Sequence, residues 1–238
     1  MSSELKLEEF DVDGAIRETA YEASETLDGE GDTRLDFLKK AGVAGGAVMG
    51  GGALLGALVP GTAVAGKGRA PRRFGKGDVG ILNFALTLEY LERDFYDEAA
   101  RKNRRRNYLG KLEREFLMAV RRDEKAHVRY LQGALGNKAI KKPKFDFRDT
   151  TGSRKPFLKT AFALENTGVG AYSGQAPFIK SGEVLLDALS IVTIEGRHAG
   201  LVGGILRGDR GVAPKGPFDK PLTAIQVLKK VKATGFIQ

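Results

Sequence analysis

Both histidines of the chain stand three residues after a glutamate. Glu124 precedes His127, and Glu195 precedes His198. At this spacing the two side chains leave one face of an α-helix about one turn apart, so each pair could bind one metal ion or bracket two. The chain contains only 2 histidines, and chance is a poor explanation for finding both in the same motif. The pattern predicts two helices that face a common metal site.

Two further glutamates stand in apolar, helix-like surroundings. Glu89 follows Leu88, Glu165 follows Leu164, and each glutamate has a tyrosine seven residues later. A carboxylate on an inner helical stripe is costly to bury unless a cation or a donor compensates it. The chain thus contains the same order of motifs twice, a single glutamate followed by a Glu-x-x-His pair. A pseudo-twofold arrangement of the two repeats would bring four carboxylates and two imidazoles together. This is the ligand set of two-metal carboxylate sites in four-helix bundles.

Alternative interpretations accompany this one. Glu92 competes with Glu89 for the inner position, and Glu89 is preferred because its neighbours match those of Glu165. The Glu-x-x-His pairs could be surface pairs that support their helices, or the carboxylates could be buried without metal against lysine or arginine. Four tyrosines are interpreted mainly as core residues with a polar tip, and otherwise as redox relays or donors to ligand carboxylates: Tyr90, Tyr96, Tyr130 and Tyr172.

Apolar residues at helical spacing predict an all-α domain. The expected helices span residues 78–101, 110–135, 156–179 and 183–207, with a short final helix opened by Pro221. The order is a short loop, a long crossover and a short loop, which is typical of a four-helix bundle with one long connection between its second and third helices. Asp78 is expected to cap the first helix, and Arg101–Asn107 to form a basic loop. The inner stripe of the second helix is expected to include Leu112, Ala119 and Tyr130.

Residues 1–65 read as an acidic leader and export signal. They carry 5 basic and 12 acidic side chains, whereas the rest of the chain carries 34 basic and 18 acidic ones. Residues 41–66 have no charge and end in Ala63-Val64-Ala65-Gly66, which a signal peptidase could cut after Ala65. The expected organisation is this leader, a basic linker at 66–77 and a folded domain at 78–238, with a periplasmic or other extracytoplasmic location. An uncleaved membrane anchor is the lesser alternative.

The leader resembles a twin-arginine export signal. The match is carried by Thr33, Arg34, Phe37, Leu38 and Lys39. The chain departs from that signal at Leu35, where a second arginine is expected, and this leaves the export route open.

Residues 78–237 resemble bacterial ferritin-like domain proteins, some of which are called desiccation-related. Four strings carry the resemblance: Ala85–Glu92, Asp123–Val128, Leu164–Tyr172 and Ile194–Ala199. The resemblance implies a ferritin-like four-helix bundle with two iron or two manganese ions. Glu124 and Glu195 would bridge the metals. Terminal ligands would be Glu89, Glu165, His127 and His198.

The leading functional hypothesis is a metal-dependent oxidoreductase, catalase-like or oxidase-like, that acts on oxygen or peroxide. The alternatives are an iron-binding or storage protein and a non-enzymatic envelope protein that protects during drying. The chain has no cysteine, which excludes disulfides and thiol catalysis. Basic clusters at 101–106 and 138–144 suit an anionic envelope surface, nucleic acid is not expected as a partner, and a homo-oligomer is left open. Gly168 and Gly170 are expected either to permit close helix approach or to open a path to the metals.

Overall fold

The computed structural model describes residues 68–238. The predicted leader, its signal and the cleavage site after Ala65 lie outside these residues. The described part contains helices and no named strand, which confirms the predicted all-α class. The helices are η2 (Arg72–Phe74), α4 (Gly77–Arg106), α5 (Lys111–Leu135), η3 (Gly136–Lys138), α6 (Arg154–Gln175), η4 (Ala176–Phe178), α7 (Gly182–Arg207), α8 (Asp209–Val212) and α9 (Ala224–Thr234).

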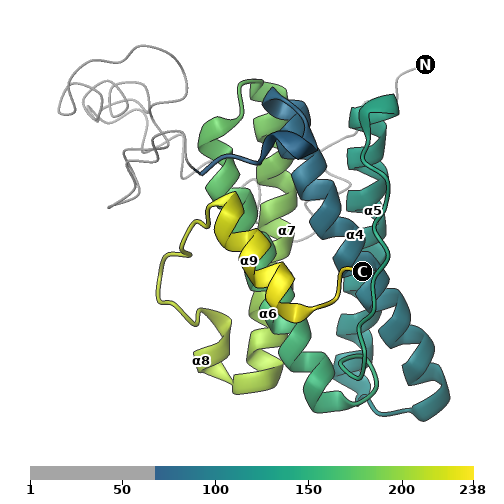
Figure 1. Cartoon of the computed structure of the whole chain (residues 1–238). Helices are drawn as coiled ribbons and strands as arrows, with labels where there is room; N and C mark the ends of the chain where they lie inside the picture. Colours follow the sequence, from purple (N-terminus) through teal and green to yellow (C-terminus); the bar gives the residue numbers. More distant parts are fainter. Residues whose placement is uncertain (1–67) are drawn as a thin grey trace, which may run out of the picture. The chain divides into compact units, whose positions relative to one another are not determined.

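The four long helices form a bundle of two helical hairpins. α4 packs against α5, and α6 packs against α7 (Figure 1). Between the hairpins, the chain runs back along α5 from its end at Leu135 to the start of α6 at Arg154 (Figure 1). This long crossover makes α4 and α6 antiparallel neighbours. The predicted bundle, with its long connection between the second and third long helices and its short C-terminal helix, is therefore confirmed.

Apolar side chains fill the bundle on both sides of its midpoint. At one end, Phe95 stacks on Phe157 with ring centroids 5.6 Å apart, and Tyr96 packs edge-on against Phe116. At the other end, a second buried cluster contains Leu86 and residues from all four helices. Both clusters follow from the helical spacing of the apolar residues. The middle of the bundle is left to polar side chains.

The crossover and the C-terminal residues are joined by backbone hydrogen bonds. Phe145 and Ile237 form an isolated antiparallel bridge, and the backbone N–H of Asp146 donates to the carbonyl of Phe236. Phe147 from the same crossover packs in the core against Phe95. A segment without regular structure is thus held along the bundle by backbone hydrogen bonds and by one buried aromatic ring.

The first helix is longer than predicted. Residues Arg101–Arg106 were expected in a basic loop, but they form the last turns of α4, which ends at a left-handed Asn107. Two features explain the difference. Three arginines in the last turn interact favourably with the helix dipole. The side chain of Asn103 is buried and accepts a hydrogen bond from the backbone N–H of Leu109, which closes the turn.

Two predicted helix starts are also corrected. Asp78 does not cap α4, since it lies in the first turn and its carboxylate accepts hydrogen bonds from the backbone N–H groups of Lys180 and Ser181, just before α7. Pro221 does not open the last helix, because α9 begins after Thr223, whose side chain forms a capping box with Gln226. The third helix starts at Arg154, which leaves Pro156 in its first turn as expected, and it ends at Gln175.

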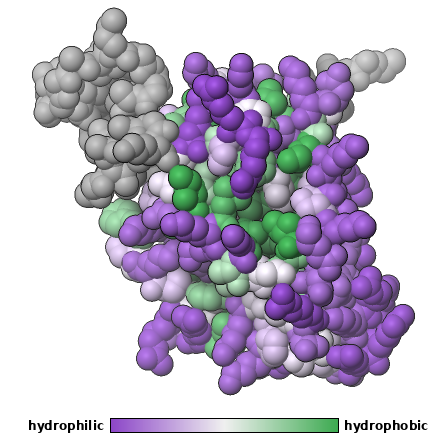
Figure 2. All heavy atoms as spheres, viewed as in Figure 1, coloured by the Kyte–Doolittle hydropathy of each residue, from purple (hydrophilic) through white to green (hydrophobic). Residues whose placement is uncertain are grey.

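The inner stripe predicted for the second helix is partly wrong. Leu112 is 53% exposed and Tyr130 is 45% exposed, whereas Ala119 is half-buried. The described residues contain no helix that is both long and apolar enough to span a membrane. Hydrophilic side chains cover most of the face drawn in Figure 2, and apolar ones gather near its centre, over the region between α4 and α9.

The segment before α9 lies directly on α6, and glycines make this possible. The backbone N–H of Leu222 donates to the carbonyl of Gly170. A Cβ atom on Gly170 would lie 2.8 Å from the Leu222 side chain, and one on Gly174 would lie 1.8 Å from the Leu222 carbonyl oxygen. Of the two predicted roles for Gly170, close approach of the backbone is therefore the one that the structure supports.

We expect Gly174→Ala to lower the free energy of unfolding by about 1–3 kcal/mol, because its methyl group would push the Leu222 backbone away. Gly133→Ala is the matched control. It changes a glycine of α5 whose added Cβ would meet nothing within 4 Å, and it should stabilise the helix by up to about 1 kcal/mol. Urea unfolding followed by circular dichroism measures both changes. Equal effects of the two variants would contradict the close packing at Gly174.

Candidate metal centre

Each long helix brings one fully buried glutamate to the middle of the bundle. These residues are Glu89 on α4, Glu124 on α5, Glu165 on α6 and Glu195 on α7, each with an exposed fraction of 0%. His127 and His198 lie one turn after the glutamates of α5 and α7 and are also buried. The structure therefore brings all six predicted site residues together. The alternative that the Glu-x-x-His motifs are surface pairs is wrong.

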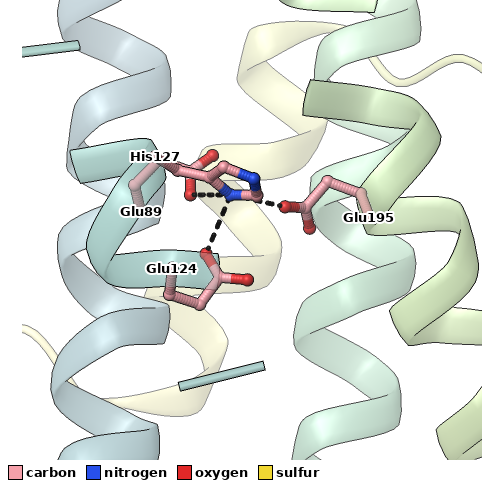
Figure 3. Close-up of side chains that lie close together, drawn as sticks. All are labelled: Glu89, Glu124, His127 and Glu195. Carbon is pink, nitrogen blue, oxygen red and sulfur yellow. Dashed lines mark hydrogen bonds and ion pairs between the residues drawn. The ribbon is translucent and has the colours of Figure 1, made fainter. Parts of the chain in front are cut away.

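Three carboxylates surround one nitrogen of His127. Its Nδ1 atom lies 3.2 Å from Glu89 Oε2, 3.4 Å from Glu124 Oε2 and 3.3 Å from Glu195 Oε1 (Figure 3). A protonated ring nitrogen has a single hydrogen to donate and cannot satisfy three acceptors at once. The arrangement, with one nitrogen and three oxygens facing a common point, is a set of donors for a cation.

His198 stands in a second group of the same kind. Its Nδ1 atom lies 3.3 Å from Glu124 Oε1 and 3.3 Å from Glu165 Oε2. One ligand atom from each of Glu124, Glu165, Glu195 and His198 can be chosen so that all four lie within 4.8 Å of one another, and the same holds for the group around His127. Glu124 and Glu195 belong to both groups. The cluster therefore contains two neighbouring candidate positions for metal ions that share two carboxylates.

Several atoms of the cluster lack hydrogen bonds. Among the described residues, no hydrogen-bond partner is found for both oxygens of Glu124, both oxygens of Glu195, Glu165 Oε2 and His198 Nδ1. Buried polar atoms nearly always have partners, and an unmade bond costs about 1–3 kcal/mol. Every one of these orphaned atoms belongs to the predicted ligand set. The residues thus fit a pair of bound cations.

Two tyrosines cross from one hairpin to the other. The hydroxyl of Tyr172 on α6 donates to Glu89 Oε1 on α4 at 2.6 Å, and the hydroxyl of Tyr96 on α4 donates to Glu165 Oε1 on α6. Each tyrosine follows the glutamate of its own helix by seven residues, so the exchange is reciprocal. This exchange of hydrogen bonds between α4 and α6 explains why the Glu–Tyr spacing is the same in both helices. Tyr96 and Tyr172 are both core residues and donors to the carboxylates, whereas Tyr130 lies at the surface.

Residues 77–207 match the family of the ferritin-like domain, and this stretch covers more than half of the chain. The chain belongs to this family. No curated protein matches the chain. In this ferritin-like domain the buried glutamates and histidines are positioned to bind metal ions, and the roles of the six residues as individual ligands stay predictions.

Asp123 is a site residue that sequence reasoning missed. Its Oδ2 atom lies 3.3 Å from Nε2 of His198, the ring nitrogen that faces away from the carboxylates. Such a contact fixes the ring orientation of a metal-binding histidine and its tautomer. The equivalent position before Glu195 is Ile194, so the two histidines are supported differently. A signal was present in the sequence, because Asp123 directly precedes a Glu-x-x-His motif.

Glu92 is a second buried residue that sequence reasoning missed. The sequence analysis treated Glu89 and Glu92 as alternatives for one inner position and preferred Glu89. Both are buried in the ferritin-like domain, and Glu92 is 3% exposed. Burial and the charges of Glu195 and Glu165 raise the pKa of Glu92 well above its usual value. Residues three apart on a helix lie about 60° apart around its axis, so both fit on one inner face. The sequence comparison of Glu89 with Glu165 could not show this.

The charge balance of the cluster excludes one predicted alternative. Among the described residues, no lysine or arginine forms an ion pair with the glutamates at the middle of the bundle, which are Glu89, Glu92, Glu124, Glu165 and Glu195. The histidines take that role in the metal-free protein. Although burial disfavours its charged form, the nearby carboxylates of Glu124 and Glu165 raise the pKa of His198 to about 11. Burial and the charge of Glu89 raise the pKa of Glu124 to about 8.

The metal-free protein should lose stability as the pH rises from about 5 to about 8. The folded state raises the pKa of Glu124 and of His198, so it holds protons that the unfolded chain releases at about pH 4.3 and 6.5. This contribution to stability is complete at a pH below the pKa values of the unfolded chain. It is lost as the pH rises through the pKa values of the folded state. Asp97 and Glu113, whose pKa is lowered, act below this window.

The measurement is urea unfolding in a strong chelator at pH 5, 6.5 and 8. In Glu124→Gln, which replaces the titrating carboxyl by an amide of the same shape, the decline should be smaller. A midpoint that rises with pH in the native sequence would contradict the raised pKa of Glu124.

Proposed function

We propose that the protein binds two iron or two manganese ions in this cluster and acts as an oxidoreductase on oxygen or peroxide. The observation that carries the proposal is the pair of four-residue groups that share Glu124 and Glu195. Two carboxylates common to both positions suit bridging between adjacent ions, as in the di-metal sites of four-helix bundles. Oxygen ligands with imidazole suit iron and manganese.

The proposal gives the residues of the cluster three kinds of role. Glu124 and Glu195 would bridge the ions, and Glu89 and Glu165 would each hold one ion from the side. His127 and His198 would each ligate one ion through Nδ1, the atom that faces the carboxylates. Two adjacent redox-active ions can supply two electrons to oxygen or peroxide, or accept two from peroxide. Four carboxylates would balance two divalent ions, which offsets the repulsion that the metal-free cluster carries.

The chain's own side chains orient the ligand groups and surround the cluster with apolar residues. Tyr172 and Tyr96 hold one oxygen of Glu89 and one of Glu165, which leaves the other oxygen of each carboxylate facing the cluster. Asp123 holds the ring of His198. Apolar side chains lie on both sides of the cluster along the bundle. A low local dielectric strengthens the interaction of the carboxylates with any bound charge.

Metal binding should stabilise the folded protein. Binding to the folded state alone adds about 2.7 kcal/mol per site at a hundredfold excess of free metal over its Kd. The double variant His127→Ala with His198→Ala should lose this effect, and Glu115→Gln on the exposed face of α5 should keep it. Thermal unfolding with and without iron or manganese measures the change. The effect should weaken at low pH, since protons compete for the same atoms.

Elemental analysis of protein from its native host, followed by assays of peroxide disproportionation and oxygen uptake, tests the reaction. We expect two equivalents of iron or manganese per chain and activity that the double histidine variant lacks. Metal without activity, in large closed shells, would favour storage instead. Absence of metal would favour a non-enzymatic role in the envelope, such as protection during drying, and would overturn the proposal.

We further propose that the mature protein is exported and begins near Gly66. The support is the sequence from Thr33 to Lys40, the uncharged stretch after it and the small residues up to Ala65. N-terminal sequencing of the native protein should find a start close to Gly66. Arg34→Gln should retain the precursor in the cytoplasm if the route is twin-arginine-like, while Lys40→Gln serves as a matched charge control. A native protein that starts at Met1 or Ser2 would contradict export with cleavage.

A further inference from the structure

Glu92 is a buried carboxylate that does not belong to the six-residue ligand set. It lies one turn after Glu89 on α4 and is 3% exposed. Among the described residues it forms no ion pair with lysine, arginine or histidine. An unpaired charge in a protein interior is costly. The Glu92 carboxyl therefore needs either a proton or a cation.

The tyrosine exchange locates Glu92 within the bundle. Tyr172 reaches Glu89, and Tyr96 reaches Glu165, so the two antiparallel helices are in register around a midpoint. On α4 this midpoint falls between Glu89 and Tyr96, which is where Glu92 stands. On α6 it falls between Glu165 and Tyr172, which is where Gly168 stands. Glu92 therefore lies close to the pseudo-twofold axis that relates the two candidate metal positions.

Gly168 provides the space for this carboxylate. A Cβ atom on Gly168 would lie 2.8 Å from Glu195 Oε2 and 3.5 Å from Glu92 Oε1. The carboxylates of Glu92 and Glu195 thus both lie beside the bare backbone of α6 at Gly168. Glu195 is one of the two residues that both metal groups share. A side chain at position 168 equivalent to Glu92 would occupy the same space, so the pseudo-twofold symmetry is broken here and only one glutamate is accommodated.

We propose that Glu92 is a seventh ligand of the metal pair, reaching it from the side between α4 and α6 that Gly168 leaves open. This inference rests on the proposed function, because it requires metal in the cluster. It gives the buried carboxylate the cation that it lacks in the protein alone.

Titration of the metal-free full-length protein with Mn²⁺ tests the assignment, with free Mn²⁺ followed by electron paramagnetic resonance. The variants are Glu92→Gln, which keeps the shape of the side chain, and Glu92→Ala, which also removes the remaining carbonyl oxygen. Both should bind at least one ion about tenfold or more weakly, since even residues behind a ligand cost 10–100-fold when lost. Glu115→Gln is the matched control for the same chemical change at an exposed position and should bind as the native sequence does.

Unfolding of the metal-free variants separates a lost ligand from a lost fold. Glu92→Gln should be at least as stable as the native protein without metal, because it removes a carboxyl from a crowded buried cluster. Weaker binding by a protein of undiminished stability supports the assignment. Unchanged affinity in both Glu92 variants would overturn it and leave the six-residue site intact. A native protein that binds no metal would overturn this inference and the proposed function together.

Discussion

Repulsion among buried carboxylates is the constraint on which the middle of this bundle depends. Glutamates from all four long helices converge there with no lysine or arginine paired to them among the described residues. In a medium of low dielectric such a group is tolerated only if protons, hydrogen-bond donors or cations offset it. His127 and the two tyrosines supply the hydrogen-bond donors that the chain itself has. The atoms that remain without partners are those that a metal pair would use.

The same constraint explains the distribution of apolar side chains. Leu86 and its neighbours at one end, and Phe95 with Phe157 at the other, supply the burial that holds the helices together around the charged middle. The crossover adds Phe147 to one of these clusters. Since each helix carries apolar residues before and after its glutamate, packing on both sides adds to the contacts inside the cluster in offsetting the cost of burying the carboxylates.

Much of this arrangement could be predicted from the sequence, because the chain has only two histidines and both stand in one motif. The order of the four glutamates along the chain then predicts the bundle and its convergence point. The prediction failed where two residues of one helix share a face, as with Glu89 and Glu92. It also failed where the partner comes from another helix, as with Asp123 and His198. The helix through Arg106 was missed because a run of charges was interpreted as a loop, although cations at a helix end are stabilising.

The exchange of tyrosines between hairpins bears on the order in which the domain assembles. A hairpin of α4 with α5 contains Glu89 and Tyr96 but neither the tyrosine that donates to that glutamate nor the carboxylate that accepts from that hydroxyl, and the hairpin of α6 with α7 lacks its two partners in the same way. We therefore expect each hairpin to form while its glutamates are still in water. Dehydration of the carboxylates falls on the later step in which the hairpins dock. That step removes water and completes both hydrogen bonds at once, so an ion present in solution would act on docking and not on hairpin formation.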